Sequence, residues 1–270
     1  RKYFNLSPQF KNIFECSGFY IVEDKHKKLI FDTGDICPPY LPAHGQCDAL
    51  SFELSINKVP MIVNSGTYGY EQGKWRNYFR STKAHNTVTI SDREQSQFWG
   101  SFRVAKRIKG LKRKHFTYNE IKFYAGSYIA FHKAEHKRYI GCIDENLIIV
   151  LDYIRGSVDN YTKSYLHFAP WAHLYFEENT AQVVYVGEDI KIFPIGTSKI
   201  EIQQGWYSEQ FNKKEENNVL VLNKDENKAC FGYLINLNST TCEMQEMGGK
   251  LEIYNNRKII INYYELGDVL

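Results

Sequence analysis

The stretch Leu41-Pro-Ala-His-Gly-Gln-Cys-Asp-Ala-Leu-Ser-Phe-Glu-Leu-Ser55 joins a polar loop to an alternating apolar pattern. His44, Gln46 and Asp48 follow one another at a spacing of two, and such side chains point to one side of an extended backbone. The alternation that starts near Leu50 predicts a half-buried strand. We therefore expect a β-scaffold that presents three polar side chains of one loop together.

The rest of the chain repeats this strand pattern. Runs rich in Val, Ile, Tyr, Phe and Thr recur about every 10 residues, and pairs such as 19–23 and 28–32 predict antiparallel hairpins. Residues 72–78 could form a helical turn, and the basic run 109–114 is interpreted as a solvated loop. We predict an all-β fold, a large antiparallel β-sandwich of the supersandwich type, in a single domain over residues 1–270.

Composition excludes several classes of function. The chain has 34 basic and 31 acidic residues and a net charge of +3, so it lacks the basic surplus of a nucleic-acid-binding protein. No apolar run approaches the roughly 20 residues of a membrane helix, so we expect no membrane partner. Six cysteines without a CxxC pair predict free thiols. The absence of an initiator methionine at Arg1 suggests part of a longer protein.

Two further segments carry candidate site residues. Asn64 ends a predicted strand beside a glycine, and Tyr68 follows it in a position suited to a ligand or to an ordinary turn. Arg76 and Arg80 can each bind a carboxylate through two hydrogen bonds. His85, at the entry of the next predicted strand, could ligate a metal, orient a substrate or simply hydrogen-bond within a turn.

These segments together resemble the C-terminal β-sandwich domain of the heparinase II/III family of polysaccharide lyases. The resemblance spans about residues 20–215 and rests on the following segments: Ala43–Leu54, Ile62–Tyr68, Tyr78–Val88, Phe98–Phe102 and Gly205–Ser208.

The resemblance implies a function and a partner domain. By this resemblance, the sandwich is expected to follow a helical N-terminal toroid, as in members of the family. Members of the family cleave uronic-acid polysaccharides, glycosaminoglycans among them, by β-elimination. His44 matches the catalytic histidine of the sandwich, which helps to neutralise the uronate carboxylate or shares the proton transfer. Tyr68, Arg76 and Arg80 are then the candidates for contact with an acidic polysaccharide. The resemblance also implies a bacterial, periplasmic or extracellular protein, and a chain that is inactive without its toroid.

The resemblance also implies a zinc site, but this chain departs from it. The three family ligand positions correspond to Gln46, Asn64 and His85, so two ligands are replaced by neutral amides. Amide oxygens are poor zinc ligands beside imidazole and carboxylate. We therefore expect weak zinc binding or none.

Two other functions remain open at this stage. Replacement of two zinc ligands by amides is also typical of a non-catalytic carbohydrate-binding or interaction module derived from the family. A sugar epimerase or mutarotase would need an acid and a base within this chain, and the sequence shows no compelling carboxylate pair. Heparan-like, alginate-like and capsular or exopolysaccharide uronates all remain candidate substrates.

Overall fold

The computed structural model of the protein describes residues 13–14, 16–156, 161–185, 187–238, 242–255 and 257–270. Within these residues the fold is almost entirely β, which confirms the predicted class. Two short helices, α1 (Lys74–Arg80) and α2 (Tyr263–Gly267), and two 3-10 turns, η1 (Pro42–His44) and η2 (Thr82–Ala84), interrupt the strands. No helix in this part of the chain is long and apolar enough to cross a membrane.

The strands form five antiparallel sheets. The first contains β1 (Ile13–Phe14), β2 (Phe19–Glu23), β3 (Lys27–Asp32), β4 (Phe52–Ile56) and β5 (Val59–Ile62), in that order. The second has the order β17 (Thr197–Tyr207), β18 (Glu215–Lys224), β13 (Thr162–His167) and β6 (Val88–Ile90). A third, small sheet pairs β7 (Phe98–Trp99) with β8 (Arg103–Val104).

The largest sheet has eight strands. Its order is β14 (His173–Glu177), β15 (Thr180–Tyr185), β16 (Glu188–Ile195), β19 (Cys230–Asn236), β12 (Leu147–Arg155), β11 (Glu135–Cys142), β10 (Ile121–Ile129) and β9 (Lys109–Tyr118). The last sheet contains β20 (Glu243–Met247), β21 (Lys250–Asn255) and β22 (Arg257–Asn262).

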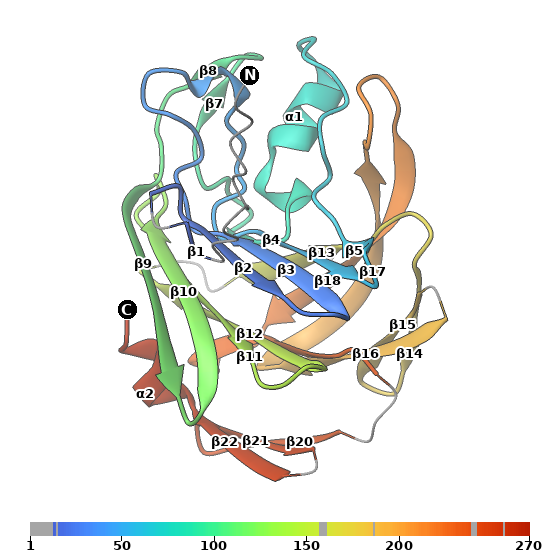
Figure 1. Cartoon of the computed structure of the whole chain (residues 1–270). Coiled ribbons are helices and arrows are strands. Elements are labelled where there is room, and N and C mark those ends of the chain that lie inside the picture. The colour runs from blue at the N-terminus through green and yellow to red at the C-terminus, as the bar shows by residue number, and fades with distance from the viewer. Residues whose placement is uncertain (1–12, 15, 157–160, 186, 239–241, 256) are drawn as a thin grey trace, which may run out of the picture.

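The sheets are stacked in three layers, with the eight-stranded sheet in the middle (Figure 1). Strand β12 shows why, because its residues are apolar on both sides. Ile148 and Val150 pack into the core between the middle sheet and the first two sheets. Leu147, Ile149 and Leu151 pack into a second core, between the middle sheet and β20–β22. A continuous apolar run is typical of a strand that is buried on both faces.

One sequence interpretation was wrong. The basic run 109–114 is not a loop, because it lies in β9, where it pairs with β10 at the edge of the eight-stranded sheet. Lysines on an edge strand keep the open edge soluble and discourage pairing with another chain. The run therefore fits an edge strand, although its many basic residues hide the alternation of apolar and polar residues that is typical of strands.

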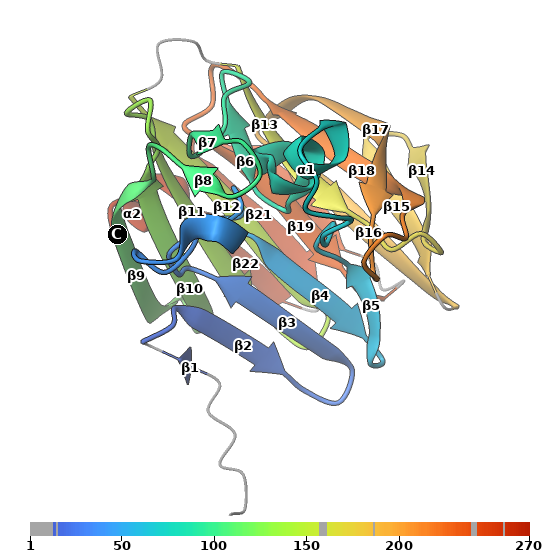
Figure 2. The ribbon, with the colours of Figure 1, turned by 90° about the horizontal axis from the view of Figure 1, so that it is seen from above.

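The connections between strands gather at one end of the molecule. Helix α1 and the β7–β8 hairpin lie side by side there, above the sheets (Figures 1 and 2). The polar loop that contains η1 reaches the same region, because its backbone accepts hydrogen bonds from α1. The end of the sandwich is thus built from segments of the chain that the sequence analysis singled out.

Candidate functional site

The polar loop is less extended than its spacing predicts. Residues 42–44 form a 3-10 turn, so the three polar side chains have different surroundings. His44 is exposed, and its ring meets Tyr70 edge-on with 5.3 Å between the ring centroids. The Gln46 amide donates to Thr67 Oγ1 at 3.1 Å. Of the three polar side chains, His44 is the exposed one and lies beside an aromatic ring, whereas Gln46 and Asp48 are half-buried.

Two buried arginines of α1 hold this loop in place. Arg76 Nη2 donates to the Ala43 carbonyl at 3.1 Å, and Arg80 Nε donates to the Gly45 carbonyl at 3.1 Å. Both guanidinium groups also donate to the Ser101 carbonyl, at 3.0 and 2.8 Å. Each arginine is only 2% exposed. This geometry favours a role in joining the loop to the β7–β8 hairpin over direct contact with a ligand.

Two of the three predicted metal positions, Gln46 and Asn64, contact the turn that follows β5. Asn64 Oδ1 accepts the backbone N–H of Gly66 at 2.9 Å, and Gln46 binds the next residue of the same turn. His85 is fully buried, and neither of its ring nitrogens has a hydrogen-bond partner among the described residues. Burial, and secondarily His167, lowers the pKa of His85 to about 3, so its imidazole is neutral.

These residues do not fit a zinc ion. The oxygen of Asn64 is already engaged by the backbone, and the amide nitrogen of Gln46 is a donor. Only His85 offers a free ligand atom of the kind that zinc prefers. In the described part of the chain no group of three or more His, Cys, Asp and Glu side chains is placed to hold a metal.

The turn after β5 is pressed against the end of β17. Gly66 has φ +81° and forms a parallel bridge with Ser208. A Cβ at this position would lie 2.1 Å from the Ser208 carbonyl oxygen, so only glycine fits. Two segments about 140 residues apart in the chain thereby share one surface.

Aromatic side chains line a hollow at this surface. A pocket of about 480 Å³ lies between the residues after the turn, the start of α1 and the loop that follows β17. His44 contacts Tyr70, which lines the pocket. The centroid of the Tyr70 ring lies 5.7 Å from that of Phe102 and 5.4 Å from that of Phe211. The pocket is lined by Tyr68, Gly69, Tyr70, Glu71, Gln72, Gly73, Lys74, Trp75, Arg76, Phe102, Phe211 and Asn212. Its size is in the usual range for ligand sites.

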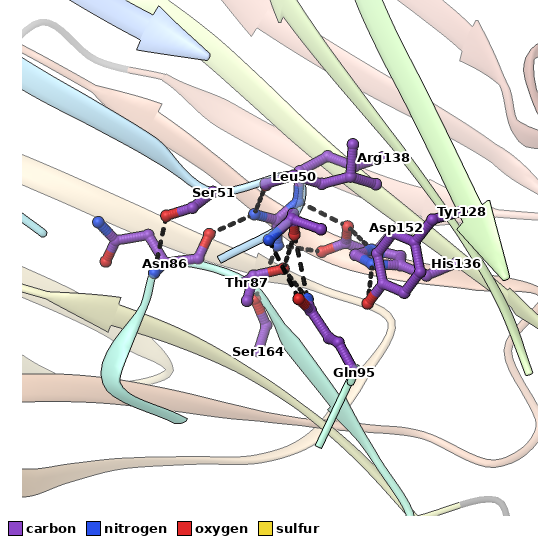
Figure 3. A network of polar contacts seen from close by, with 11 residues as sticks. Leu50, Ser51, Asn86, Thr87, Gln95, Tyr128, His136, Arg138, Asp152 and Ser164 are labelled. Carbon is purple, nitrogen blue, oxygen red and sulfur yellow. Dashed lines mark hydrogen bonds and ion pairs between the residues drawn. The ribbon is translucent and has the colours of Figure 1, made fainter. Parts of the chain in front are cut away.

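A buried ionic network joins the middle sheet to Leu50 and Asn86 (Figure 3). On the middle sheet, Arg138 binds Asp152 through two hydrogen bonds of 2.8 and 2.9 Å. Its remaining nitrogen donates to the carbonyls of Leu50 and Asn86, where the His44 loop and the His85 segment end. His136 donates to Asp152 at 2.7 Å. Burial alone would raise the pKa of Asp152, but Arg138 and His136 lower it below its usual value.

Sequence reasoning did not find this network or most of the pocket. Arg138 and Asp152 sit on strands with no motif around them, and their partners are far away in the chain. Phe102 belongs to a segment that carries the resemblance but was not predicted to line a pocket, and Phe211 gave no signal beyond being aromatic. Tyr70 could have been found, because it follows Tyr68 at the alternating spacing.

Comparison with known proteins identifies the family of the chain. The sequence model of the "Heparinase II/III-like, C-terminal" family matches residues 10–242. The chain belongs to the heparinase II/III family. This confirms the resemblance on which the predicted function depends, and no curated protein matches the chain.

Solved structures share the fold of this heparinase II/III-like domain. Heparan sulfate lyase HepC from Pedobacter heparinus superposes with a TM-score of 0.74 at 17% identity, over 92% of this chain and 41% of its own. A structure of heparinase III gives a TM-score of 0.71 at 14% identity, over 91% of this chain and 41% of its own. The chain thus spans about two fifths of the length of these neighbours.

Proposed function

We propose that the chain is the C-terminal domain of a polysaccharide lyase that cleaves uronic-acid-containing glycans by β-elimination. The observation that carries the proposal is His44, an exposed imidazole held at the rim of an aromatic pocket by two buried arginines. Aromatic rings beside a polar group suit a sugar, which presents apolar faces and hydroxyl groups. The neighbours named as heparan sulfate lyases support the same substrate class.

The chemistry assigns His44 a limited part. Elimination requires neutralisation of the uronate carboxylate, removal of the proton beside it and protonation of the departing C4 oxygen. The His44 side chain makes no hydrogen bond with any described residue, so its ring nitrogens can face a substrate. It would help to neutralise the carboxylate or share a proton transfer. The remaining acid–base groups would come from a toroid domain outside this chain.

The other predicted contacts divide into two groups. Tyr68 lines the pocket and can meet a sugar directly. Arg76 and Arg80 would act as positioning residues, because their guanidinium groups are engaged by backbone carbonyls.

An activity assay tests the proposal. The chain, joined to any sequence that precedes it in its gene, is incubated with heparan-type, alginate-type and capsular uronic-acid polymers, and the ultraviolet absorbance of unsaturated uronate is followed. We expect release of unsaturated product from one class of polymer.

His44→Ala should lower the rate at least about 100-fold, as expected for loss of a proton-transfer group. His173→Ala, on the edge strand β14, is the matched control and should leave the rate unchanged. Unsaturated product at an undiminished rate from His44→Ala would contradict the proposal.

A second function has one observation in its favour. Gln46 and Asn64 are amides engaged in local hydrogen bonds, as expected if the domain kept its fold and lost its chemistry. A non-catalytic carbohydrate-binding domain would bind the same polymers without forming unsaturated product.

A further inference from the structure

Two lysines contact aromatic rings that line the pocket. Lys74 itself lines the pocket, whereas Lys214 is not among its lining residues but contacts two of its rings, Tyr68 and Trp75. Lys214 Nζ is 4.5 Å from the ring centroid of Trp75, 4.6 Å from that of Tyr68 and 5.5 Å from that of Trp206. Lys74 Nζ lies 4.9 Å from the Trp75 ring. Such contacts hold a cation over ring faces, where the ring quadrupole attracts it.

The rings that Lys214 contacts are held in place by their surroundings. The Trp75 ring meets Trp206 edge-on at 4.9 Å and Tyr68 at 6.0 Å. The loop after β17 is anchored by the N–H of Asn212, which donates to the Tyr68 carbonyl at 2.7 Å. Lys214 is half-buried and places its ammonium group against rings whose positions are set by these contacts.

Neither lysine is neutralised by the described part of the chain. No carboxylate there forms an ion pair with Lys74 or Lys214, whereas six other lysines of the described residues form one. Glu71 is the one carboxylate among the residues that line the pocket. An ammonium group over aromatic rings keeps N–H donors for a further acceptor, and an anion is the acceptor that binds it most strongly.

We propose that Lys74 and Lys214, with the ring of Trp75, form a subsite for an anionic sugar residue, whose carboxylate or sulfate group the two ammonium groups bind. The sugar would lie in the pocket beside Tyr70, next to His44. This inference rests on the proposed function and names the residues that select an acidic glycan at that site. Neither lysine is a catalytic residue, because both act by binding.

Binding to defined oligosaccharides tests the subsite. Isothermal titration calorimetry on the 270-residue chain uses three probes of equal length: a heparosan oligosaccharide, which carries carboxylates only, a sulfated heparin oligosaccharide, and carboxyl-reduced heparosan, which is neutral. We expect binding of one or both acidic probes, weakening with added salt, and at least about tenfold weaker binding of the neutral probe. Preference between the acidic probes identifies carboxylate or sulfate as the bound group.

Substitutions connect the preference to the two lysines. Lys74→Met and Lys214→Met each remove a charge but keep side-chain length, and each should weaken acidic binding about tenfold. Lys214→Arg keeps the cation over the rings and should bind within a few-fold of wild type. Lys250→Met, on the opposite layer of the molecule, is the matched control. Thermal melting establishes that each variant is folded, and Lys74, which is exposed, can be replaced without disturbing packing.

The outcomes separate this inference from the proposed function. Equal affinity of wild type and both methionine variants would overturn the subsite but leave the lyase proposal, which depends on His44. Equal binding of neutral and acidic probes, or no binding of any probe, would also overturn the subsite. Lysine-dependent binding together with no elimination in the activity assay would support the subsite and contradict the lyase proposal.

Discussion

His85 shows at the scale of one residue how the candidate site departs from a metal centre. Its imidazole is fully buried, and both nitrogens lack hydrogen-bond partners among the described residues. A buried polar atom without a partner costs about 1–3 kcal/mol. Gln46 and Asn64 do not offset this cost, because the hydrogen bonds of their side chains are made to other residues.

Two substitutions of His85 should have opposite effects. His85→Ala leaves a cavity and should lower the free energy of unfolding by about 2–4 kcal/mol, as for other large buried side chains. His85→Leu stays close to the volume of histidine and removes both unpaired nitrogens, so the free energy of unfolding should stay equal or rise. Urea denaturation measures both. A large loss of stability in His85→Leu together with a loss in wild type treated with a chelator would show that an ion is bound there.

Asp48 gives a pH-dependent prediction. Desolvation, and secondarily the nearby Asp32, raises the pKa of Asp48 to about 7. The folded state thus favours the protonated carboxyl, so this contribution to stability is complete below about pH 3.8 and is lost as the pH rises through 7. Asp48→Asn removes the charge. The free energy of unfolding of the variant, relative to that of wild type, should therefore rise as the pH increases from 5 to 8.

The size and the test of this effect follow from linkage. Each unit of pKa shift corresponds to about 1.4 kcal/mol, so the relative gain should exceed 1 kcal/mol. Urea denaturation of wild type and Asp48→Asn at both pH values measures it. Parallel curves with a pH-independent difference would contradict a raised pKa for Asp48.

Site residues differ in how far sequence could predict them. His44, Gln46, Asn64 and His85 were found because they occupy known positions of a motif, and the structure places them around one end of the sandwich. Their catalytic and metal roles remain predictions. Spacing does not encode the direction of a long side chain, so it did not predict that the guanidinium groups of Arg76 and Arg80 donate to backbone carbonyls. Their contact with a ligand stays a prediction.

At the scale of elements, α1 acts as the support of the His44 loop. Seven residues are too few for a stable isolated helix, so α1 depends on what its two buried arginines bind. Arg80→Met removes donors to the carbonyls of Gly45 and Ser101. We expect a loss of at least about 1.5 kcal/mol of stability, together with faster amide hydrogen exchange in residues 43–47.

A comparison of two variants distinguishes support from ligand contact. Arg80→Lys keeps the charge but cannot reproduce the planar fork of donors, so it should behave like Arg80→Met in hydrogen exchange. If Arg80 instead contacted the glycan as a point charge, Arg80→Lys would bind oligosaccharide like wild type and show normal exchange in the loop.

Strands were predictable where one face is buried and less so at edges. Strands β2, β3, β4 and β12 follow apolar patterns that composition reveals directly. Edge strands expose both faces for part of their length, so β9 appeared to be a basic loop. The eleven-residue strand β17 has no clear apolar pattern for a related reason, because most of its residues are partly or fully exposed.

At the scale of the whole molecule, Arg138 and Asp152 connect the middle sheet to the site. Arg138→Met leaves the Asp152 carboxylate buried without its main partner, and should lower stability by about 3–5 kcal/mol. Adding Asp152→Leu removes the uncompensated charge and should recover part of the loss. Thermal unfolding of the single and double variants measures this coupling. Additive losses would contradict a paired network.

No local pattern could have predicted this network. Its residues come from β11, β12 and the ends of two loops, which the chain topology brings together only after the sheets are stacked. The third layer was missed for a similar reason, because β20–β22 have the strand pattern of any sheet, and their place on the outer face of the middle sheet depends on the complete fold.

That third layer also has a consequence for how the protein is made. During synthesis the ribosome releases β10, β11, β12 and β19 before it has produced the strands that cover their outer face. Until residues 243–266 emerge, side chains such as Phe123, Ile149 and Leu151 face water on a large apolar surface. The nascent chain therefore passes through a stage that invites aggregation or chaperone binding, which ends only when the closing strands dock.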